Sequence, residues 1–420
     1  MDTVDLARLQ FALTAGAHFL FVALTLGLAT LVAVIQTRAT LGRSTIHMRM
    51  TRFWGQLYII NYAMGIVTGL VMEFQLGLSW SGLTDFAGNA FGSALALETV
   101  VAFFVESTFL GLWIFGWERL NRWAHLSLIW IVTLTAYASA FWVMVSNGFL
   151  QNPVGYRSEG GVLHVVDFGA MVANPAGLVA FAHILSGALV AGGFVMAGVS
   201  AYHLRRRTTE QDFFRKSLRL GVGVSLPALV LTGTFGGIGF DTLQPGKAAA
   251  FTGDAGRMAQ AQAEMTALHG PGDYLPSAGW VQGGGMTMLV VFGVLLLLAA
   301  LNVLLMLFRP VVRGFRLWHW TMTASIPLPF VAMLGGWIFR EMGRQPWAVY
   351  GLLTTADAMS PVTGGQMLFS LTAFVGVFAV LTVINYWLLA RAARRGPDGV
   401  TLGGERRAET PERPDPALTF

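Results

Sequence analysis

Five side chains that can bind a metal or carry a proton stand inside apolar segments of this sequence. Ionisable side chains are costly where a segment faces lipid, so they are expected to have a partner or a function there. Each also has a plainer explanation: a neutral histidine bonded to a neighbouring helix, a methionine that fills the core, or a glutamate in an ion pair. The five are His18, Glu98, His183, Met288 and Glu341.

Glu341 belongs to the stretch Trp-Ile-Phe-Arg-Glu-Met-Gly-Arg-Gln-Pro-Trp, which runs from Trp337 to Trp347 and closes an apolar run. Both tryptophans and Arg344 are explained as anchors at a membrane surface, whereas Glu341 is not. The five side chains come from five apolar segments, and we expect them all within the outer third of a membrane. Helical bundles build cofactor sites from inward side chains, and His, Met and carboxylate donors without Cys suit haem iron. The chain has no Cys, and the number of these donors implies two or more haems.

A second glutamate, Glu106, lies eight residues after Glu98 in the same apolar segment. On a regular helix this spacing corresponds to about 80° of rotation, so both can face one interior. An ion pair is the alternative, but the neighbouring segments contain almost no Lys or Arg. We therefore interpret both as metal ligands or proton carriers. Ser107 and Ser139 could extend a proton route, unless each hydroxyl bonds only its own helix backbone.

The overall composition indicates that these residues belong to a polytopic membrane protein. Of the 420 residues, 55% are hydrophobic and only 12% are charged, whereas soluble domains contain about 25% charged residues. The opening residues include Asp2, Asp5 and Arg8 rather than a basic region, so we expect no cleaved signal peptide. The net charge of +5 comes from short loops between apolar segments, so membrane topology explains it better than nucleic-acid binding does.

Hydropathy predicts an all-α fold with nine membrane-spanning helices. The odd-numbered connections carry most of the Lys and Arg, so the positive-inside rule predicts an outer N-terminus and a cytoplasmic C-terminus. The expected spans are Phe11–Ile35, Phe53–Met72, Phe91–Trp117, Leu126–Phe149, Leu178–His203, Leu220–Phe240, Gly284–Phe308, Trp320–Phe339 and Phe369–Leu389.

Three parts of the chain are expected from this pattern. Residues 1–391 form the helical bundle, and within it 241–283 form one long, partly helical outer connection. Residues 392–420 are polar and rich in Pro, Gly and charge, which predicts a disordered cytoplasmic tail.

Four motifs of the chain are specific enough to compare with known families. The first is Arg8-Leu-Gln-Phe-Ala-Leu-Thr-Ala-Gly-Ala-His18, and the second runs from Ala96-Leu-Glu98 to Glu106-Ser-Thr108. The third is Asn147-Gly-Phe-Leu-Gln-Asn-Pro153, and the fourth is Gly343-Arg-Gln-Pro-Trp347 preceded by Glu341. Together they resemble subunit I, the haem-bearing large subunit, of the cytochrome bd-type terminal oxidases, and the similarity covers nearly all nine expected spans.

The resemblance implies reduction of O₂ to water with a low-spin haem b, a high-spin haem b and a haem d. By position, His183 and Met288 would bind the low-spin haem b, while His18 and Glu341 would each bind one high-spin haem. Glu98 would lie at the high-spin pair. The proton supply would include Glu106, Ser107 and Ser139, and haem-side groups would include Arg8, Trp337 and Arg344. Protons taken from the cytoplasm would make the reaction electrogenic.

The resemblance also implies partners and a location. Subunit II of the oxidase and small single-span subunits would assemble with this chain in the bacterial cytoplasmic membrane, surrounded by lipid. Quinol and O₂ would be the substrates, and the outer loop that carries Gln244 and Lys247 would take part in quinol oxidation.

That loop departs from the family pattern. A glutamate usually closes the motif that begins at Gln244, but this chain has Thr252, and Met286 stands where the family usually has Arg. Threonine cannot take a proton from quinol, so either Asp254 or Glu264 serves, or the electron donor is not a quinol. The alternatives are therefore a bd-like oxidase fed by a donor such as a cytochrome c, and a non-catalytic haem-binding relative.

Overall fold

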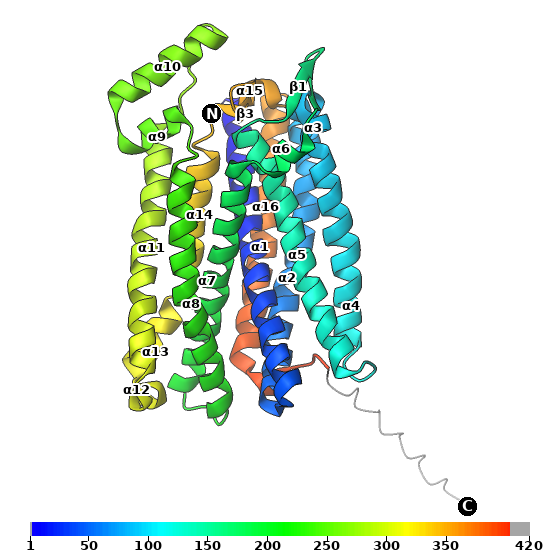
Figure 1. The fold of residues 1–420 in the computed structure, drawn as a ribbon, viewed down its shortest axis with the longest axis vertical. Coiled ribbons are helices and arrows are strands. Elements are labelled where there is room, and N and C mark those ends of the chain that lie inside the picture. The colour runs from blue at the N-terminus through cyan, green and yellow to red at the C-terminus, as the bar shows by residue number, and fades with distance from the viewer. Residues whose placement is uncertain (1, 404–420) are drawn as a thin grey trace, which may run out of the picture.

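The computed structural model is a bundle of long helices that run between two ends of the molecule (Figure 1). It describes residues 2–403, without the side chains of residues 101–103 and 313. Within this part of the chain, nine helical segments are long and apolar enough to cross a membrane, which confirms the predicted number. The start of α1 and the end of α16 lie at opposite ends of the bundle (Figure 1).

Each predicted span corresponds to one observed helical segment, and every observed segment is longer because its helix begins earlier than predicted. The third and seventh segments end two residues before the predicted limits, at Phe115 and Met306. Three spans are composite: α3, η1 and α4 form the third, α6 and α7 the fifth, and α13 and α14 the eighth. The long helices are α1 (Thr3–Gly42), α2 (Thr45–Ser79), α3 (Ser81–Thr99), α5 (Arg122–Gln151), α7 (Pro175–Arg205), α8 (Gln211–Phe240), α11 (Ala278–Met306), α14 (Leu328–Glu341) and α16 (Gly364–Arg395). The shorter ones are η1 (Val100–Glu106), α4 (Ser107–Phe115), α6 (Phe168–Val172), α9 (Pro245–Thr252), α10 (Ala255–His269), α12 (Arg309–Gly314), α13 (Arg316–Ala324), α15 (Thr355–Ala358) and η2 (Pro397–Gly399).

Side-chain caps fix where several of these helices begin. Asp2, Ser44, Asn121 and Asn174 each accept a hydrogen bond from a backbone N–H in the first turn of the helix that follows. These bonds satisfy donors that an α-helix leaves without partners at its N-terminus. The caps therefore define the helix ends independently of hydropathy.

The third span contains a π-helical segment, η1, between α3 and α4. A π-helix has wider turns than an α-helix, so it changes the rotation between residues on either side of it. Glu98 lies before this segment and Glu106 closes it. The rotation of about 80° expected between the two glutamates therefore does not hold, because it assumed a regular α-helix.

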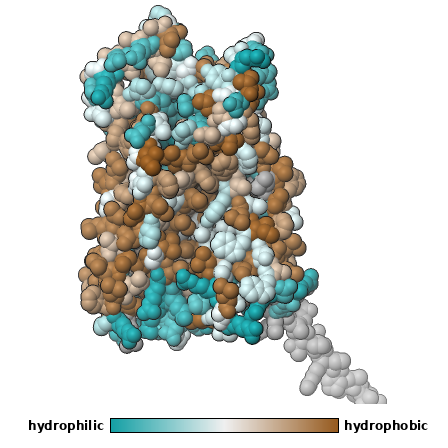
Figure 2. Space-filling model, in the orientation of Figure 1, coloured by the Kyte–Doolittle hydropathy of each residue, from teal (hydrophilic) through white to brown (hydrophobic). Residues whose placement is uncertain are grey.

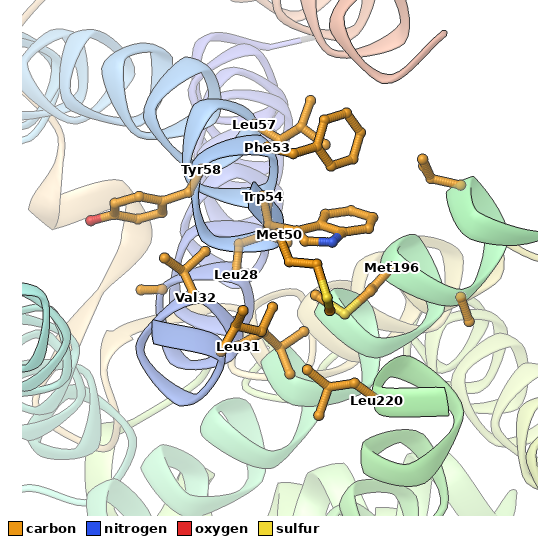
Figure 3. Packing of buried hydrophobic residues seen from close by; sticks show 14 of the residues in the cluster. Leu28, Leu31, Val32, Met50, Phe53, Trp54, Leu57, Tyr58, Met196 and Leu220 are labelled. Carbon is orange, nitrogen blue, oxygen red and sulfur yellow. The ribbon is translucent and has the colours of Figure 1, made fainter. Parts of the chain in front are cut away.

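The main buried core lies where α1, α2, α7 and α8 meet. Figure 3 shows Leu28 and Leu31 of α1, Met50 and Trp54 of α2, and Met196 of α7 within this cluster. On the face that Figure 2 shows, an apolar belt lies between two hydrophilic ends. This surface is the one expected of a protein that lipid surrounds.

The long connection between α8 and α11 folds into α9 and α10, which lie beyond the end of the bundle (Figure 1). The expectation of a partly helical excursion is therefore confirmed, although α11 already begins at Ala278. Two short hairpins lie at the same end: β1 (Tyr156–Glu159) pairs with β2 (Val162–Val165), and β3 (Trp347–Val349) pairs with β4 (Leu353–Thr354).

The region expected to be a tail begins as ordered structure. Helix α16 continues to Arg395, and the chain then returns to the bundle, where Leu402 is buried near Gly55. Residues 404–420, the rest of the expected tail, lie outside the described residues.

Candidate functional site

Glu341, the last residue of α14, is buried with only 3% of its surface exposed. Its Oε2 accepts a hydrogen bond of 2.6 Å from Arg344, and its Oε1 accepts one of 2.9 Å from Asn147 and one of 3.4 Å from Gln151. Asn147 and Gln151 belong to the last turns of α5. The end of α5 and the end of α14 are thus held together through one carboxylate.

Arg340 is a partly buried cation that the sequence analysis did not select. Its Nε donates to Oδ1 of Asn147 at 2.8 Å, and its Nη2 donates to the carbonyl of Ala176 at the start of α7 at 3.2 Å. The Glu341 carboxylate lies 3.9 Å away. The sequence places Arg340 directly before Glu341, which could have indicated a role for the arginine. A hydropathy analysis, however, treats both residues only as the polar end of a helix.

The two intramembrane histidines each have one ring nitrogen engaged within the bundle. Nδ1 of His183 lies 2.9 Å from the carbonyl of Thr232, so this nitrogen carries the proton. Nδ1 of His18 lies 3.0 Å from the hydroxyl of Thr68, which donates its own hydrogen to backbone carbonyls of α2 and therefore accepts from the histidine. In both rings, Nε2 keeps a lone pair and has no hydrogen bond among the described residues. This orientation is typical of histidines that bind a metal.

Met288 lies where α11 and α14 pack closely through glycines. A Cβ atom at Gly336 would come within 3.0 Å of the Met288 sulfur, and one at Gly335 would come within 2.8 Å of its backbone nitrogen. Met286, by contrast, is 52% exposed on the surface of the bundle. The thioether of Met288 is therefore the one that faces the glycine surface of α14.

Two other predicted residues join α14 and its exit to α1. Nε1 of Trp337 donates to the carbonyl of Ala12 at 3.3 Å, and its ring stacks on Phe19. Nε of Arg8 donates to Oε1 of Gln345 at 3.0 Å. The stretch from Trp337 to Trp347 thus contacts the ends of several helices, as its unusual polarity suggested.

The glutamates of the third span have different surroundings. Oε1 of Glu98 accepts a hydrogen bond of 2.9 Å from Ser139, which the sequence analysis had grouped with Glu106. Glu106 is only 4% exposed, and its carboxyl group has no hydrogen-bond partner among the described residues. Ser107 lies 3.3 Å from the hydroxyl of Tyr62 instead. A buried carboxyl group without a partner is the kind of group that transfers protons rather than stabilising the fold.

Lys247 connects the outer loop to the end of α14. Its ammonium group is buried, donates to the carbonyl of Arg340 at 3.3 Å, and lies 4.5 Å from the ring centre of Phe339. Burial, together with the positive charge of Arg340, lowers the pKa of Lys247 to about 7. Gln244 also contacts the bundle, because its Nε2 donates to the carbonyl of Gln151 at 2.9 Å.

A pocket lies between this loop and the exit of α14. Its walls include Lys247, Glu264, Tyr274, Gln345 and Tyr350. Burial raises the pKa of Tyr350, and the nearby charge of Glu264 raises it further. The pocket therefore brings a lysine, a carboxylate and aromatic rings together next to the Glu341 region.

The structure distinguishes the three loop residues that could act on a substrate. The Thr252 hydroxyl bonds the carbonyls of Ala248 and Ala249 in its own helix. Asp254 caps α10 and pairs with Arg257 at 3.4 Å. Glu264, one of the two replacement bases that the sequence analysis named, is the one of the three that lies in the wall of the Lys247 pocket.

The donor set fits haem iron on two observations. Among the described residues, no three His, Cys, Asp or Glu side chains group together to hold a metal ion, so each donor would hold iron singly. Nε2 of His18 and Nε2 of His183 have no hydrogen bond among the described residues, so each keeps a lone pair that could bind iron. Oε2 of Glu341 accepts one hydrogen bond, from Arg344, which leaves a lone pair, because a carboxylate oxygen can accept two.

A nine-span helical bundle with separate imidazole, thioether and carboxylate donors is the architecture of a haem-binding membrane protein. The family described as cytochrome bd terminal oxidase subunit I matches residues 6–273 and 273–397. The chain therefore belongs to this family, as the sequence resemblance predicted.

Relatives and a solved structure agree with this assignment. Cytochrome bd ubiquinol oxidase subunit 1 of Bacillus subtilis is 37% identical, and the match covers 95% of each chain. Cytochrome bd-II ubiquinol oxidase subunit 1 of Escherichia coli is 32% identical over 95% of this chain and 98% of the relative. The bd oxidase structure from Geobacillus thermodenitrificans superposes with a TM-score of 0.83 at 25% identity, covering 94% of this chain and 99% of that chain.

Membership of the family establishes the general class of function. The chain is a multi-pass membrane protein of respiratory electron transport, with terminal oxidase activity at the level of the family. Haem and iron follow from the same membership. As subunit 1 of an oxidase with several subunits, it has subunit II as a partner.

Proposed function

We propose that this chain oxidises quinol and reduces O₂ to water, with protons taken from the basic end of the bundle. The observation that carries the proposal is that the Lys247 pocket adjoins the exit of α14. The pocket that contains Lys247 is bounded by Gly343, Arg344 and Gln345, and Lys247 bonds the residue before Glu341. A quinol in this pocket would lie directly beside the stretch that carries a haem ligand.

In the proposed assignment, His183 and Met288 bind a low-spin haem b. His18 and Glu341 each bind one of two high-spin haems, a haem b and a haem d. The bound haems would pass electrons from quinol to O₂. The chain's own contribution is to fix the ring orientation of both histidines through Thr68 and Thr232. Trp337, Arg8 and Arg344 would line the haems, with both arginines suited to propionates.

In the loop pocket, we propose that Glu264 takes the place of the missing glutamate. Its carboxylate would accept the proton of a quinol hydroxyl, and Lys247 would donate a hydrogen bond to a quinol oxygen. Gln244 would hold the loop against α5 through Gln151. The support is that Glu264 lines the pocket, whereas Asp254 is engaged by Arg257 and the first turn of α10.

The proposed proton route passes through the third span. Glu106 would receive protons from the basic end, because it is buried and has no partner that would hold its charge. Ser107 and Tyr62 lie beside it, and the pair Glu98 and Ser139 would continue the route toward the high-spin haems. The positive-inside rule would make the basic end cytoplasmic, in a bacterial cytoplasmic membrane, and the reaction electrogenic. Small single-span subunits are proposed as further partners.

Oxygen uptake by the purified complex with subunit II tests this function. Ubiquinol, menaquinol and reduced cytochrome c are supplied separately as donors. We expect uptake with at least one quinol and none with the cytochrome. Uptake with the cytochrome alone would instead support the bd-like oxidase with another donor, and haem binding without uptake from any donor would indicate a non-catalytic relative.

A further inference from the structure

A cavity of ≈ 360 Å³ opens at the basic end of the bundle, opposite α9 and α10. It lies between α1, α2 and α8, at the end of the bundle opposite the Lys247 pocket. Basic side chains form one part of its wall, and apolar side chains form the other. The basic residues are Arg38, His47, Lys216 and Arg219, and the apolar ones are Ile35, Met50, Leu220 and Val224.

Three of the cations in this wall have no counter-charge. Arg38, Lys216 and Arg219 make no ion pair and no side-chain hydrogen bond among the described residues. Lys216 and Arg38 are close enough to His47 to act on it electrostatically, so the positive charges converge on one cavity. Like charges held close together repel, and an anion between them would remove that cost.

Two of the other cations at the same end of the bundle are paired. Arg49 forms a two-bond ion pair with Glu210, and Arg215 lies 3.4 Å from Asp212. Arg309 and Arg316 are exposed and make no ion pair among the described residues. The cavity differs from them because its unpaired cations share one wall with apolar side chains.

The apolar part of the wall belongs to the buried core. Met50 and Leu220 both lie in the main cluster, where Figure 3 shows them beside Met196. At this end of the bundle, Figure 2 shows a hydrophilic border below the apolar belt. The cavity therefore offers cations to a charged group and apolar side chains to a chain attached to it.

We propose that this cavity binds the phosphate group of an anionic phospholipid, with the first part of an acyl chain against its apolar wall. A free phosphate ion would satisfy the cations but would leave the apolar wall uncovered. An amphiphile satisfies both, and such molecules are concentrated where a membrane helix passes from apolar to polar surroundings. The site is independent of the proposed oxidase function.

Lipid titration followed by native mass spectrometry of the whole complex with subunit II tests the proposal. Phosphatidylglycerol and phosphatidylcholine are titrated separately into detergent-solubilised wild type and into the double variant Lys216→Gln, Arg219→Gln. Each cation near a membrane surface contributes about fivefold to the binding of an anionic lipid. We expect the double variant to bind one phosphatidylglycerol about 25-fold more weakly, with phosphatidylcholine binding unchanged.

The double variant Arg309→Gln, Arg316→Gln is the matched control, because it removes two exposed arginines from the same end outside the cavity. It should bind phosphatidylglycerol within about twofold of wild type. All variants should keep the wild-type haem spectrum, which shows that the fold is intact. An equal loss of phosphatidylglycerol binding in both double variants, or no loss in either, would overturn the proposal. Displacement of the lipid by inorganic phosphate, but not by chloride at the same ionic strength, would overturn the choice of a lipid as ligand.

Discussion

The exit of α14 and the loop that carries α9 and α10 meet at Lys247, yet they are built differently. At the exit, Glu341 is buried and accepts hydrogen bonds from three side chains, two on α5 and one in the turn that follows α14. In the loop, the carboxylate that faces the pocket is Glu264, which is exposed and bonded only to Gln260 one turn away. Glu341 is thus fixed by contacts with α5, whereas Glu264 is tied to its own helix.

The difference explains why one region keeps its sequence signature and the other does not. A change at Glu341 would leave several buried donors without an acceptor, which is costly. A change at Thr252 alters only bonds to its own helix backbone. The function of the loop then depends on which carboxylate reaches the pocket, and a neighbouring helix can supply it.

Replacing Glu341 by alanine should have the largest effect, because it leaves Arg344 buried without its counter-charge. Removing one partner of a buried pair costs about 3–5 kcal/mol. We expect a lower midpoint of thermal unfolding of the complex and a loss of haem. The ratio of haem to protein and the unfolding midpoint are measured beside Glu118→Ala as a control in a loop. A wild-type haem ratio and unfolding midpoint for Glu341→Ala would show that the contacts of Glu341 contribute little to stability or haem binding.

Glu106 is an intermediate case, since it is buried like Glu341 but lacks partners. Glu106→Gln keeps the shape of the side chain and removes its ability to carry a proton. We expect turnover with quinol to fall by about 10²-fold, with haem content and stability retained. A wild-type rate of oxygen uptake would exclude Glu106 from the proton route.

In the loop, Glu264→Gln should lower kcat/KM for quinol by about 10-fold to 10²-fold, because a pocket carboxylate that accepts a proton is lost. Asp254→Asn is the matched control, since it removes a carboxylate of the same loop outside the pocket. Neither variant should change the haem spectrum. Equal kinetics for the two variants would contradict the assignment of Glu264.

Thr252→Glu should have the smallest effect. The threonine hydroxyl bonds only its own helix, so the unfolding free energy should change by no more than about 0.5 kcal/mol. We expect kcat/KM for quinol to stay within about twofold, because Glu264 already supplies the base. A large gain in kcat/KM would show that the pocket lacks a base in the natural chain.

The sequence predicts the bundle well because lipid imposes a strong and local signal. Nine apolar segments and their unexplained polar residues can be recognised one segment at a time. Partners are harder to predict: Asn147 and Glu341 are 194 positions apart, and no local pattern connects them. The same limit hides the role of Arg340 and the pairing of Ser139 with Glu98.

Two further features depend on three-dimensional placement. The π-helical segment η1 changes the relation between Glu98 and Glu106, and apolar residues of ordinary helical type give no sign of it. Glu264 reaches the pocket only because α10 folds back over the exit of α14. The basic cavity near Arg38 likewise combines residues from three helices that are separated along the chain.

The central claim is that the hydrogen bond at Nδ1 of His18 and of His183 leaves Nε2 of each ring free to bind haem iron. The reduced optical spectrum of His183→Ala tests it most directly. His203→Ala is the control, because His203 lies at the other end of α7 and bonds the carbonyl of Ala393 on α16. We predict that His183→Ala loses the low-spin haem signal, whereas His203→Ala keeps it. An unchanged low-spin signal in His183→Ala would contradict the account.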